Sequence, residues 1–133
     1  MNIKQTLVFR RDLKVRKGKL IAQGAHAAMS FISDQIRNSV YSVNYDQFIY
    51  TVKLTEEQHE WMKGLFTKIC LVVNDEAELL EIHDKALKAG LTSYLIKDAG
   101  LTEFKGVPTL TCIAIGPHES ERIDAITKEL EMF

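Results

Sequence analysis

The sequence is poor in cysteine, proline and tryptophan, with two, two and one of these residues in 133. Cys70 and Cys112 both lie inside apolar runs, where a thiol usually behaves as a small hydrophobic group, and no structural disulfide is expected. No run approaches the roughly 18 uninterrupted apolar residues of a membrane-spanning helix. Charged residues also occupy the N-terminal stretch, where a signal peptide would need its apolar segment. We therefore expect a soluble, cytoplasmic protein without a membrane partner.

The sequence also lacks the short motifs of several enzyme classes. The stretch RKGKL has neither the upstream glycine nor the Ser or Thr after Lys19 that a phosphate-binding P-loop needs. There is no GxGxxG after a predicted strand and no GxSxG. HEWMK carries Lys63 where a zinc-binding helix would have its second histidine, and the histidines and cysteines show no other metal-ligand spacing. We expect no metal, no cofactor and no activated cysteine thiolate.

What the sequence does contain is a local excess of positive charge. The whole chain has a formal net charge of -1, yet residues 4–19 hold seven basic residues and one acidic residue. The basic residues are Lys4, Arg10, Arg11, Lys14, Arg16, Lys17 and Lys19, and the acidic one is Asp12. Such a patch on a nearly neutral protein indicates an anionic partner at one face; the alternative is a solvated, lysine-rich loop.

Hydrophobic periodicity divides the chain into strands and helices. Strands are predicted at residues 4–10, 67–73, 92–98 and 110–116, and helices at residues 19–38, at residues 56–65, from Asn74 or Asp75 to Gly90, and from near Pro117. The segment 39–54 is either an extended connection or a short hairpin. Residues 67–73 are apolar almost throughout, as expected of a strand covered on both faces.

This order of elements predicts one α/β domain over residues 1–133, a small three-layer sandwich with helices covering a four-stranded sheet. Sites in such folds usually lie in loops that leave the C-terminal ends of strands. The candidate site loops are therefore residues 11–18 and 98–108.

The first predicted helix carries a narrow polar stripe on an otherwise apolar surface. Lys19, Gln23, His26 and Ser30 follow one another at spacings of four, three and four, which places them on one line along the helix. Alanines and a glycine flank them, and such small neighbours indicate close packing around the stripe. Because polar groups held in such a place need partners, the stripe is either a binding or catalytic surface or a solvated helix face.

The loop DAGLT is a second candidate. Asp98 ends a predicted strand and offers an acceptor carboxylate, Gly100 permits a close backbone approach, and Thr102 adds a hydroxyl. The alternative is that Asp98 and Thr102 only close the loop through bonds to the backbone.

Three segments, LVFRRDLKVRKGKLIAQGAHAA, DAGLTEF and TLTCIAIGP, together resemble the peptidyl-tRNA hydrolases of the second type, a small family typical of archaea and eukaryotes. The resemblance implies a mixed four-stranded sheet flanked by helices, often in a dimer. It also implies cleavage of the ester between a peptide's C-terminus and the terminal ribose of tRNA. The resemblance extends over both ends of the chain and is weakest in residues 33–62.

The resemblance assigns roles to particular residues. The family's functional lysine, glutamine, aspartate and threonines fall on Lys19, Gln23, Asp98, Thr102 and Thr111, and its histidine on His26. Our hypothesis is that Asp98 orients or deprotonates a water molecule and Lys19 stabilises the developing anion, with the side chains of Gln23, His26 and Thr102 as positioning donors. The tRNA backbone would be held by Arg10, Arg11, Lys14, Arg16 and Lys17, with Thr111 also on the substrate side.

Two residues depart from the family pattern. Leu101 stands where the family commonly has arginine, and Glu103 where it commonly has glutamine. The loss of a cation and the gain of a carboxylate are expected to weaken RNA binding or alter the substrate. Two alternatives to the peptidyl-tRNA esterase therefore stay open. One is a non-catalytic tRNA-binding or protein-interaction module of the same fold, and the other is an esterase or amidase for a small substrate.

Overall fold

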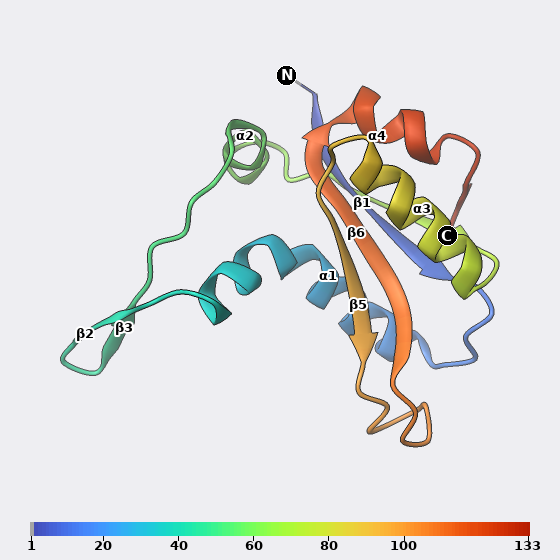
Figure 1. The fold of residues 1–133 in the computed structure, drawn as a ribbon, viewed down its shortest axis with the longest axis horizontal. Coiled ribbons are helices and arrows are strands. Elements are labelled where there is room, and N and C mark those ends of the chain that lie inside the picture. The colour runs from blue at the N-terminus through green and yellow to red at the C-terminus, as the bar shows by residue number, and fades with distance from the viewer. Residues whose placement is uncertain (1) are drawn as a thin grey trace.

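In a computed structural model, which describes residues 2–133, a mixed sheet lies between two layers of helices (Figure 1). The sheet has the strand order β5-β6-β1-β4-β7. Its strands are β1 (Ile3–Arg10), β4 (Lys68–Val73), β5 (Ser93–Asp98), β6 (Thr109–Glu119) and β7 (Glu131–Met132). β1 and β4 are parallel, whereas every other neighbouring pair is antiparallel. The predicted α/β three-layer class and the mixed sheet are confirmed.

The predicted number of strands was wrong by one, because a fifth strand lies at the edge of the sheet. β7 is two residues long and pairs with Leu71 and Val72 of β4. Two residues are too few to show any periodicity. The last helix, α4 (Ser120–Thr127), also starts later than expected, because Pro117 lies inside β6, which runs on to Glu119 beside Ile3 of β1.

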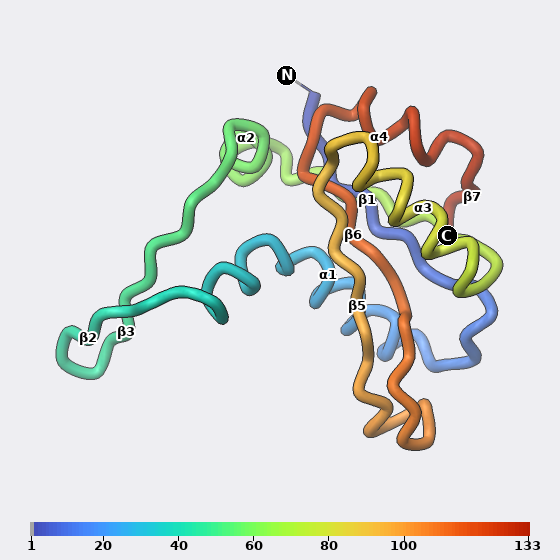
Figure 2. The backbone as a smooth tube through the Cα atoms, in the orientation of Figure 1, coloured from blue at the N-terminus to red at the C-terminus, as the bar shows by residue number. Residues whose placement is uncertain are grey.

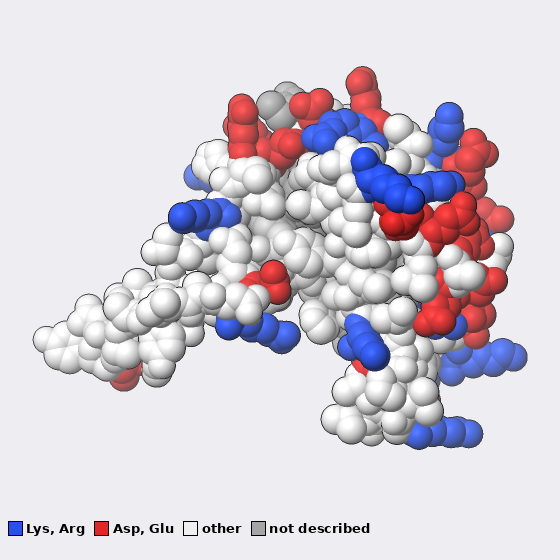
Figure 3. Space-filling view, in the orientation of Figure 1, with Lys and Arg blue, Asp and Glu red and all other residues white. Residues whose placement is uncertain are grey.

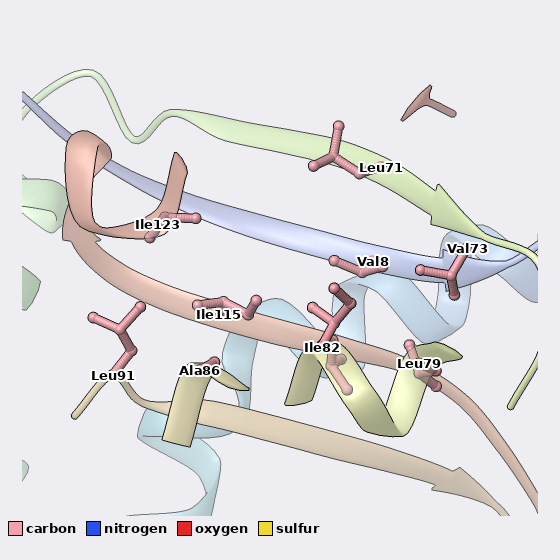
Figure 4. Packing of buried hydrophobic residues seen from close by; sticks show 10 residues of the cluster. Val8, Leu71, Val73, Leu79, Ile82, Ala86, Leu91, Ile115 and Ile123 are labelled. Atoms are coloured by element: carbon pink, nitrogen blue, oxygen red, sulfur yellow. The ribbon is translucent and has the colours of Figure 1, made fainter. Parts of the chain in front are cut away.

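Alternating side chains of β1 point into two separate hydrophobic cores, one on each face of the sheet. Val8 points to the face covered by α3 (Glu76–Lys88) and α4, where it packs with residues such as Leu79 and Ile123 (Figure 4). Leu7 and Phe9 point to the other face, which α1 (Lys17–Arg37) covers. A strand buried between two helical layers has apolar residues on both faces, which explains why Leu7, Val8 and Phe9 are apolar in succession.

Two helix starts follow the capping rules. Thr55 caps α2 (Glu56–Lys63) in a capping box with Gln58, and Asp75 caps α3 by accepting a hydrogen bond from the Glu78 backbone. Gly90, just after α3, adopts the left-handed φ of +79° expected of a helix stop. The predicted helices around residues 56–65 and 75–90 are confirmed.

The expectation that β4 is covered on both faces was wrong for its first half. Leu71, Val72 and Val73 are buried, but Lys68 and Cys70 are exposed, since α1 packs over β5, β6 and β1 and leaves this part of β4 open. Cys70 is therefore an exposed thiol, contrary to the sequence expectation, whereas burial raises the pKa of Cys112 to about 12.

The segment 39–54, for which the sequence allowed either an extended connection or a short hairpin, contains a hairpin. Its strands are β2 (Ser42–Asn44) and β3 (Gln47–Ile49), and it extends from the end of α1 away from the sheet (Figure 2). We call residues 38–54 the arm. Within residues 2–133, no helix combines the length and the hydropathy that crossing a membrane requires.

Candidate functional site

α1 places two members of the polar stripe beside the end of β5. Lys19 Nζ lies 2.6 Å from Asp98 Oδ2, and Gln23 Nε2 donates a hydrogen bond of 2.9 Å to the same oxygen. The Lys19 and Asp98 side chains are only 16% and 9% exposed, so water screens their interaction weakly. The two candidate motifs, far apart in the sequence, thus meet in one cluster.

A buried threonine fixes the orientation of the Gln23 amide. Thr111, on β6, donates a hydrogen bond of 2.8 Å from its hydroxyl to Gln23 Oε1. Since Thr111 is 1% exposed, water does not compete for this contact. The amide oxygen thus faces Thr111 and its nitrogen faces Asp98, so four side chains form one chain of contacts in the order Thr111, Gln23, Asp98, Lys19.

The loop after β5 binds the second carboxylate oxygen of Asp98. Asp98 Oδ1 accepts a hydrogen bond of 2.7 Å from the Gly100 backbone N–H. Gly100 has a φ of +82°, and a Cβ at this position would come within 2.4 Å of the Val107 carbonyl oxygen. Only glycine fits here. Lys19 Nζ also donates to Thr102 Oγ1 at 2.9 Å, so the loop is closed at Asp98 and tied to the helix at Thr102.

These donors determine the charge state of Asp98. The hydrogen bond from Lys19 is the main cause that lowers the pKa of Asp98 below its ordinary value, with further contributions from Gly100 and Gln23, while desolvation opposes them. Asp98 is therefore an ionised carboxylate. A carboxylate of lowered pKa is a weak base and a good hydrogen-bond acceptor, which favours the role of orienting water over that of deprotonating it.

The cluster opens to solvent at the start of α1. A hollow of about 500 Å³ is lined there by residues that include Arg16, Gly18 and Lys19 from one side and Thr102 and Glu103 from the other. The hollow is lined by both loops that the fold prediction selected, residues 11–18 and 98–108.

Glu103 contacts the N-terminus of α1, a role that sequence reasoning missed. Its carboxylate lies 2.6 Å from Arg16 Nε and accepts a hydrogen bond of 3.3 Å from the Arg16 backbone. The Arg16 guanidinium lowers the pKa of Glu103. α1 has no acidic residue in its own first turn, so Glu103 supplies the negative charge that a helix N-terminus favours. The available signal was the Glu103 carboxylate itself, which stands where the family commonly has glutamine.

The other half of the stripe lies outside the cluster. His26 is exposed one helical turn beyond Gln23, beside a hollow of about 150 Å³ that Ser30 and Tyr94 also line. The Ser30 hydroxyl donates back to the His26 carbonyl within α1. The structure thus brings Lys19 and Gln23 to Asp98 but leaves His26 apart from it, and a positioning role for His26 stays a prediction.

The basic segment is partly neutralised by its own neighbours. Arg10 pairs with Asp12 at 2.8 Å and donates to the Leu110 carbonyl at 2.8 Å, and Arg11 pairs with Glu131 at 3.1 Å. Lys14 and Lys17 are exposed and form no ion pair within residues 2–133. These two lysines are the cations of the predicted tRNA-binding set that are most available to an anionic partner.

No metal-binding group is formed within residues 2–133: nowhere do three His, Cys, Asp or Glu side chains come together as a metal ion would need. The contacts of the cluster are all hydrogen bonds and one ion pair between protein groups.

Comparison with known protein families shows which family the chain belongs to. The family model described as "Peptidyl-tRNA hydrolase PTH2" matches residues 3–133. The chain belongs to this family. Its members are hydrolases that act on an ester bond, and the resemblance noted in the sequence is confirmed.

Individual relatives match over nearly the whole chain. A peptidyl-tRNA hydrolase of Methanopyrus kandleri is 37% identical over 129 residues, which cover 97% of each chain. One of Methanocaldococcus jannaschii is 36% identical over 130 residues, covering 98% of this chain and 99% of the relative. A protein of Dictyostelium discoideum named a probable peptidyl-tRNA hydrolase 2 is 32% identical, and the match covers 98% of this chain and 54% of that protein.

The fold also occurs at low sequence identity. A solved structure of a protein of unknown function from Agrobacterium tumefaciens matches with a TM-score of 0.57 at 13% identity, covering 100% of this chain and 98% of that one. At this identity the match supports the fold alone. Membership of the peptidyl-tRNA hydrolase family rests on the family model and the curated relatives.

Proposed function

We propose that the protein hydrolyses the ester bond of peptidyl-tRNA, releasing the peptide and the tRNA. Membership of the peptidyl-tRNA hydrolase family supports the substrate. The observation that carries the proposal is the Lys19–Asp98 ion pair of 2.6 Å, whose lysine lines an open hollow and whose carboxylate is held by Gln23 and the buried Thr111. A reacting ester in the hollow would meet the Lys19 ammonium group, with the Asp98 carboxylate 2.6 Å from that nitrogen.

In the proposed reaction, Asp98 accepts a hydrogen bond from a water molecule and directs the water oxygen at the ester carbonyl. The bond between the carbonyl carbon and the ribose oxygen breaks, and the proton lost by the water ends on that ribose oxygen. Lys19 donates to the oxyanion that develops at the carbonyl. Donors aimed at such an oxyanion are typically worth about 10²- to 10³-fold in kcat.

The remaining residues hold these groups and the substrate. Gln23 orients the Asp98 carboxylate, and Thr102 orients the Lys19 ammonium group. The exposed Lys14 and Lys17 bind phosphates of the tRNA backbone through contacts that do not depend on base sequence. A hydrolase of this substrate would work in the cytoplasm, where tRNA is used.

The test is release of the blocked amino acid from N-acetyl-aminoacyl-tRNA by the purified protein with a chelator present. We expect turnover by the natural protein and a loss of at least about 10²-fold in kcat for Lys19→Met and for Asp98→Asn. Glu81→Gln, on the exposed side of α3, is the matched control and should keep full turnover. Circular dichroism establishes that each variant is folded.

Three outcomes would overturn the proposal. Turnover that survives both substitutions would remove Lys19 and Asp98 from the reaction. The absence of turnover by the natural protein, together with salt-dependent binding of the tRNA, would instead indicate a non-catalytic tRNA-binding module. Hydrolysis of small esters with an affinity that ignores salt would indicate a substrate without nucleic acid.

A further inference from the structure

A small polar hollow of about 150 Å³ lies between α1 and β5, and the proposed reaction leaves it without a role. Its lining includes His26, Ser30 and Arg37 of α1 and Tyr94, Leu95 and Ile96 of β5. His26 and Arg37 are exposed and Tyr94 is half-buried, so their hydrogen-bond donors can reach a molecule in the hollow.

The hollow continues the line of the reactive groups. On α1, His26 follows Lys19 along the same polar stripe, about 10 Å further at the helical rise of 1.5 Å per residue. On β5, Ile96 and Tyr94 lie about 7 Å and about 13 Å from Asp98 at the rise of an extended strand. A substrate bound at Lys19 and Asp98 can therefore extend between α1 and β5 into the hollow.

The two parts of the substrate must leave the reactive groups in different directions, because the ester bond lies between the tRNA and the peptide. The exposed Lys14 and Lys17, the proposed phosphate ligands, precede Lys19 at the N-terminal end of α1. The hollow lies further along the same helix, toward its C-terminal end. With the tRNA at the first end, the hollow is on the side left for the peptide.

The charge of the hollow also fits a peptide better than a second stretch of RNA. Its lining holds one basic and one acidic side chain, Arg37 and Asp34, so it has no excess of positive charge. In the space-filling view, charged side chains gather over α3 and α4, whereas the surface over α1 and β5 is mostly uncharged (Figure 3). Phosphates need an excess of lysine and arginine, whereas a peptide backbone is uncharged and needs donors and acceptors.

The backbone of β5 offers such donors and acceptors, because β5 is an edge strand that pairs only with β6. The Thr92 carbonyl accepts a hydrogen bond of 3.0 Å from the Gly116 N–H, and the Ile96 carbonyl accepts one of 3.4 Å from the Thr111 hydroxyl, both on the β6 side. Backbone groups alternate in direction along a strand, so the N–H and C=O of Leu95 point to the open edge. The Leu95 side chain packs in the core on the α3 face, so Leu95 lines the hollow through its backbone.

We propose that the peptide part of peptidyl-tRNA binds in an extended conformation between α1 and β5, where it pairs with the edge of β5 at Leu95 and places a side chain in the hollow beside Tyr94. This inference rests on the proposed hydrolysis. At about 3.3 Å per residue, the hollow is reached by the second to fourth residues of the peptide, counted from the ester. His26 would then position the substrate through its peptide part.

The test compares kcat/KM for two substrates on the same tRNA, N-acetyl-alanyl-tRNA and N-acetyl-tetraalanyl-tRNA. We expect the natural protein to prefer the tetrapeptide about tenfold, because two backbone hydrogen bonds with Leu95 each contribute a factor of about 2 to 10. A third substrate is N-methylated at the three residues that the short substrate lacks, so these residues cannot donate to β5. Its preference over the short substrate should be lower by at least about threefold.

Variants of the hollow test the same placement from the side of the protein. Tyr94→Phe with Arg37→Ala removes donors from the hollow and should lower the preference for the tetrapeptide at least about threefold. Tyr45→Phe with Arg122→Ala makes the same chemical changes on the arm and on α4, and should keep the full preference. Because the preference is a ratio of two values for one protein, a partly unfolded variant does not change it.

The outcomes separate this inference from the proposed function. Equal kcat/KM for the short and the long substrate would overturn the inference and leave the hydrolysis intact. A preference that the hollow variant retains would overturn the placement of the peptide beside Tyr94, and one that survives N-methylation would overturn its pairing with β5. The absence of turnover with every substrate would overturn the proposed function and this inference with it.

Discussion

Asp98 is surrounded by donors to an unusual degree for a carboxylate near the surface. Lys19 and Gln23 bind one of its oxygens and the Gly100 N–H binds the other. Each of these donors favours the charged form of the side chain, which is why its pKa is lowered. The same contacts therefore link the site to the acid stability of the protein.

The lowered pKa of Asp98 predicts a pH window for stability. Because the pKa is lower in the folded than in the unfolded protein, the stabilisation is fully present above about pH 4, the ordinary pKa, and is lost as the pH falls through the folded value. Asp98→Asn removes this contribution. We expect the free energy of unfolding, measured in urea from pH 2 to pH 6, to fall less steeply on acidification in the variant than in the natural protein. Parallel curves would contradict this prediction.

The position of the Glu103 carboxylate leads to a prediction about tRNA binding. Its carboxylate pairs with Arg16 and occupies the N-terminus of α1, where a phosphate of the substrate would otherwise bind. Glu103→Gln should therefore strengthen tRNA binding and make its salt dependence steeper by about one phosphate contact. Filter binding at several salt concentrations measures both, with Glu81→Gln as the control of equal charge change. Weaker binding by the Glu103 variant would show that the carboxylate supports the site rather than competing with phosphate.

At the scale of one element, α1 connects the core to the site. One face of the helix packs on the sheet, one flank carries Lys19 and Gln23, and another flank lines an apolar groove of about 530 Å³ together with Cys70 of β4. Its distance from the sheet depends on Gly24, where an added Cβ would lie 3.1 Å from the Phe9 ring. A displacement of the helix would move Lys19 and Gln23 together.

Gly24→Val tests this packing. The larger side chain must push Phe9 or the helix away, and overpacking of this kind typically costs about 1 to 3 kcal/mol. We expect the free energy of unfolding to fall by this amount in a denaturant titration. Gly24→Val gains helix propensity, so propensity does not account for the loss. Ala22→Val, at an exposed position of the same helix, introduces valine away from the Phe9 ring and should cost only a few tenths of a kcal/mol, within the ~0.7 kcal/mol range of that scale. Equal losses would show that the contact with Phe9 is unimportant.

At the scale of the whole molecule, the distribution of charge matters more than its sum. The net charge is -1, yet Lys14 and Lys17, in the segment just before Lys19, are exposed and form no ion pair within residues 2–133. The arm, by contrast, carries almost no charge. The molecule therefore has one segment suited to an anionic substrate and, apart from it, an arm with few charged residues.

The salt dependence of tRNA binding tests this separation. Each phosphate contact contributes about 0.9 to the slope of the logarithm of affinity against the logarithm of salt concentration. Lys14→Gln with Lys17→Gln should therefore reduce the slope by roughly two contacts. The corresponding pair on the other face of the sheet, Lys85→Gln with Lys88→Gln, should leave it unchanged. A reduction of equal size in both variants would mean that binding depends on overall charge alone.

The sequence by itself determined the features that depend on neighbours a few residues apart. Periodicity and caps such as Thr55 and Asp75 located most strands and helices, because these signals act within one turn or one strand. The motifs around Lys19 and Asp98 were likewise sufficient to identify the family, which the family model confirms.

The tertiary structure alone decided which of these residues meet. It joined Lys19 and Gln23 to Asp98, left His26 apart, and brought Glu103 to the start of α1. These outcomes depend on how a helix lies across a sheet, which no local pattern encodes. The exposure of Cys70 has the same origin, since an apolar run is buried only where a helix covers it, and on this part of β4 none does.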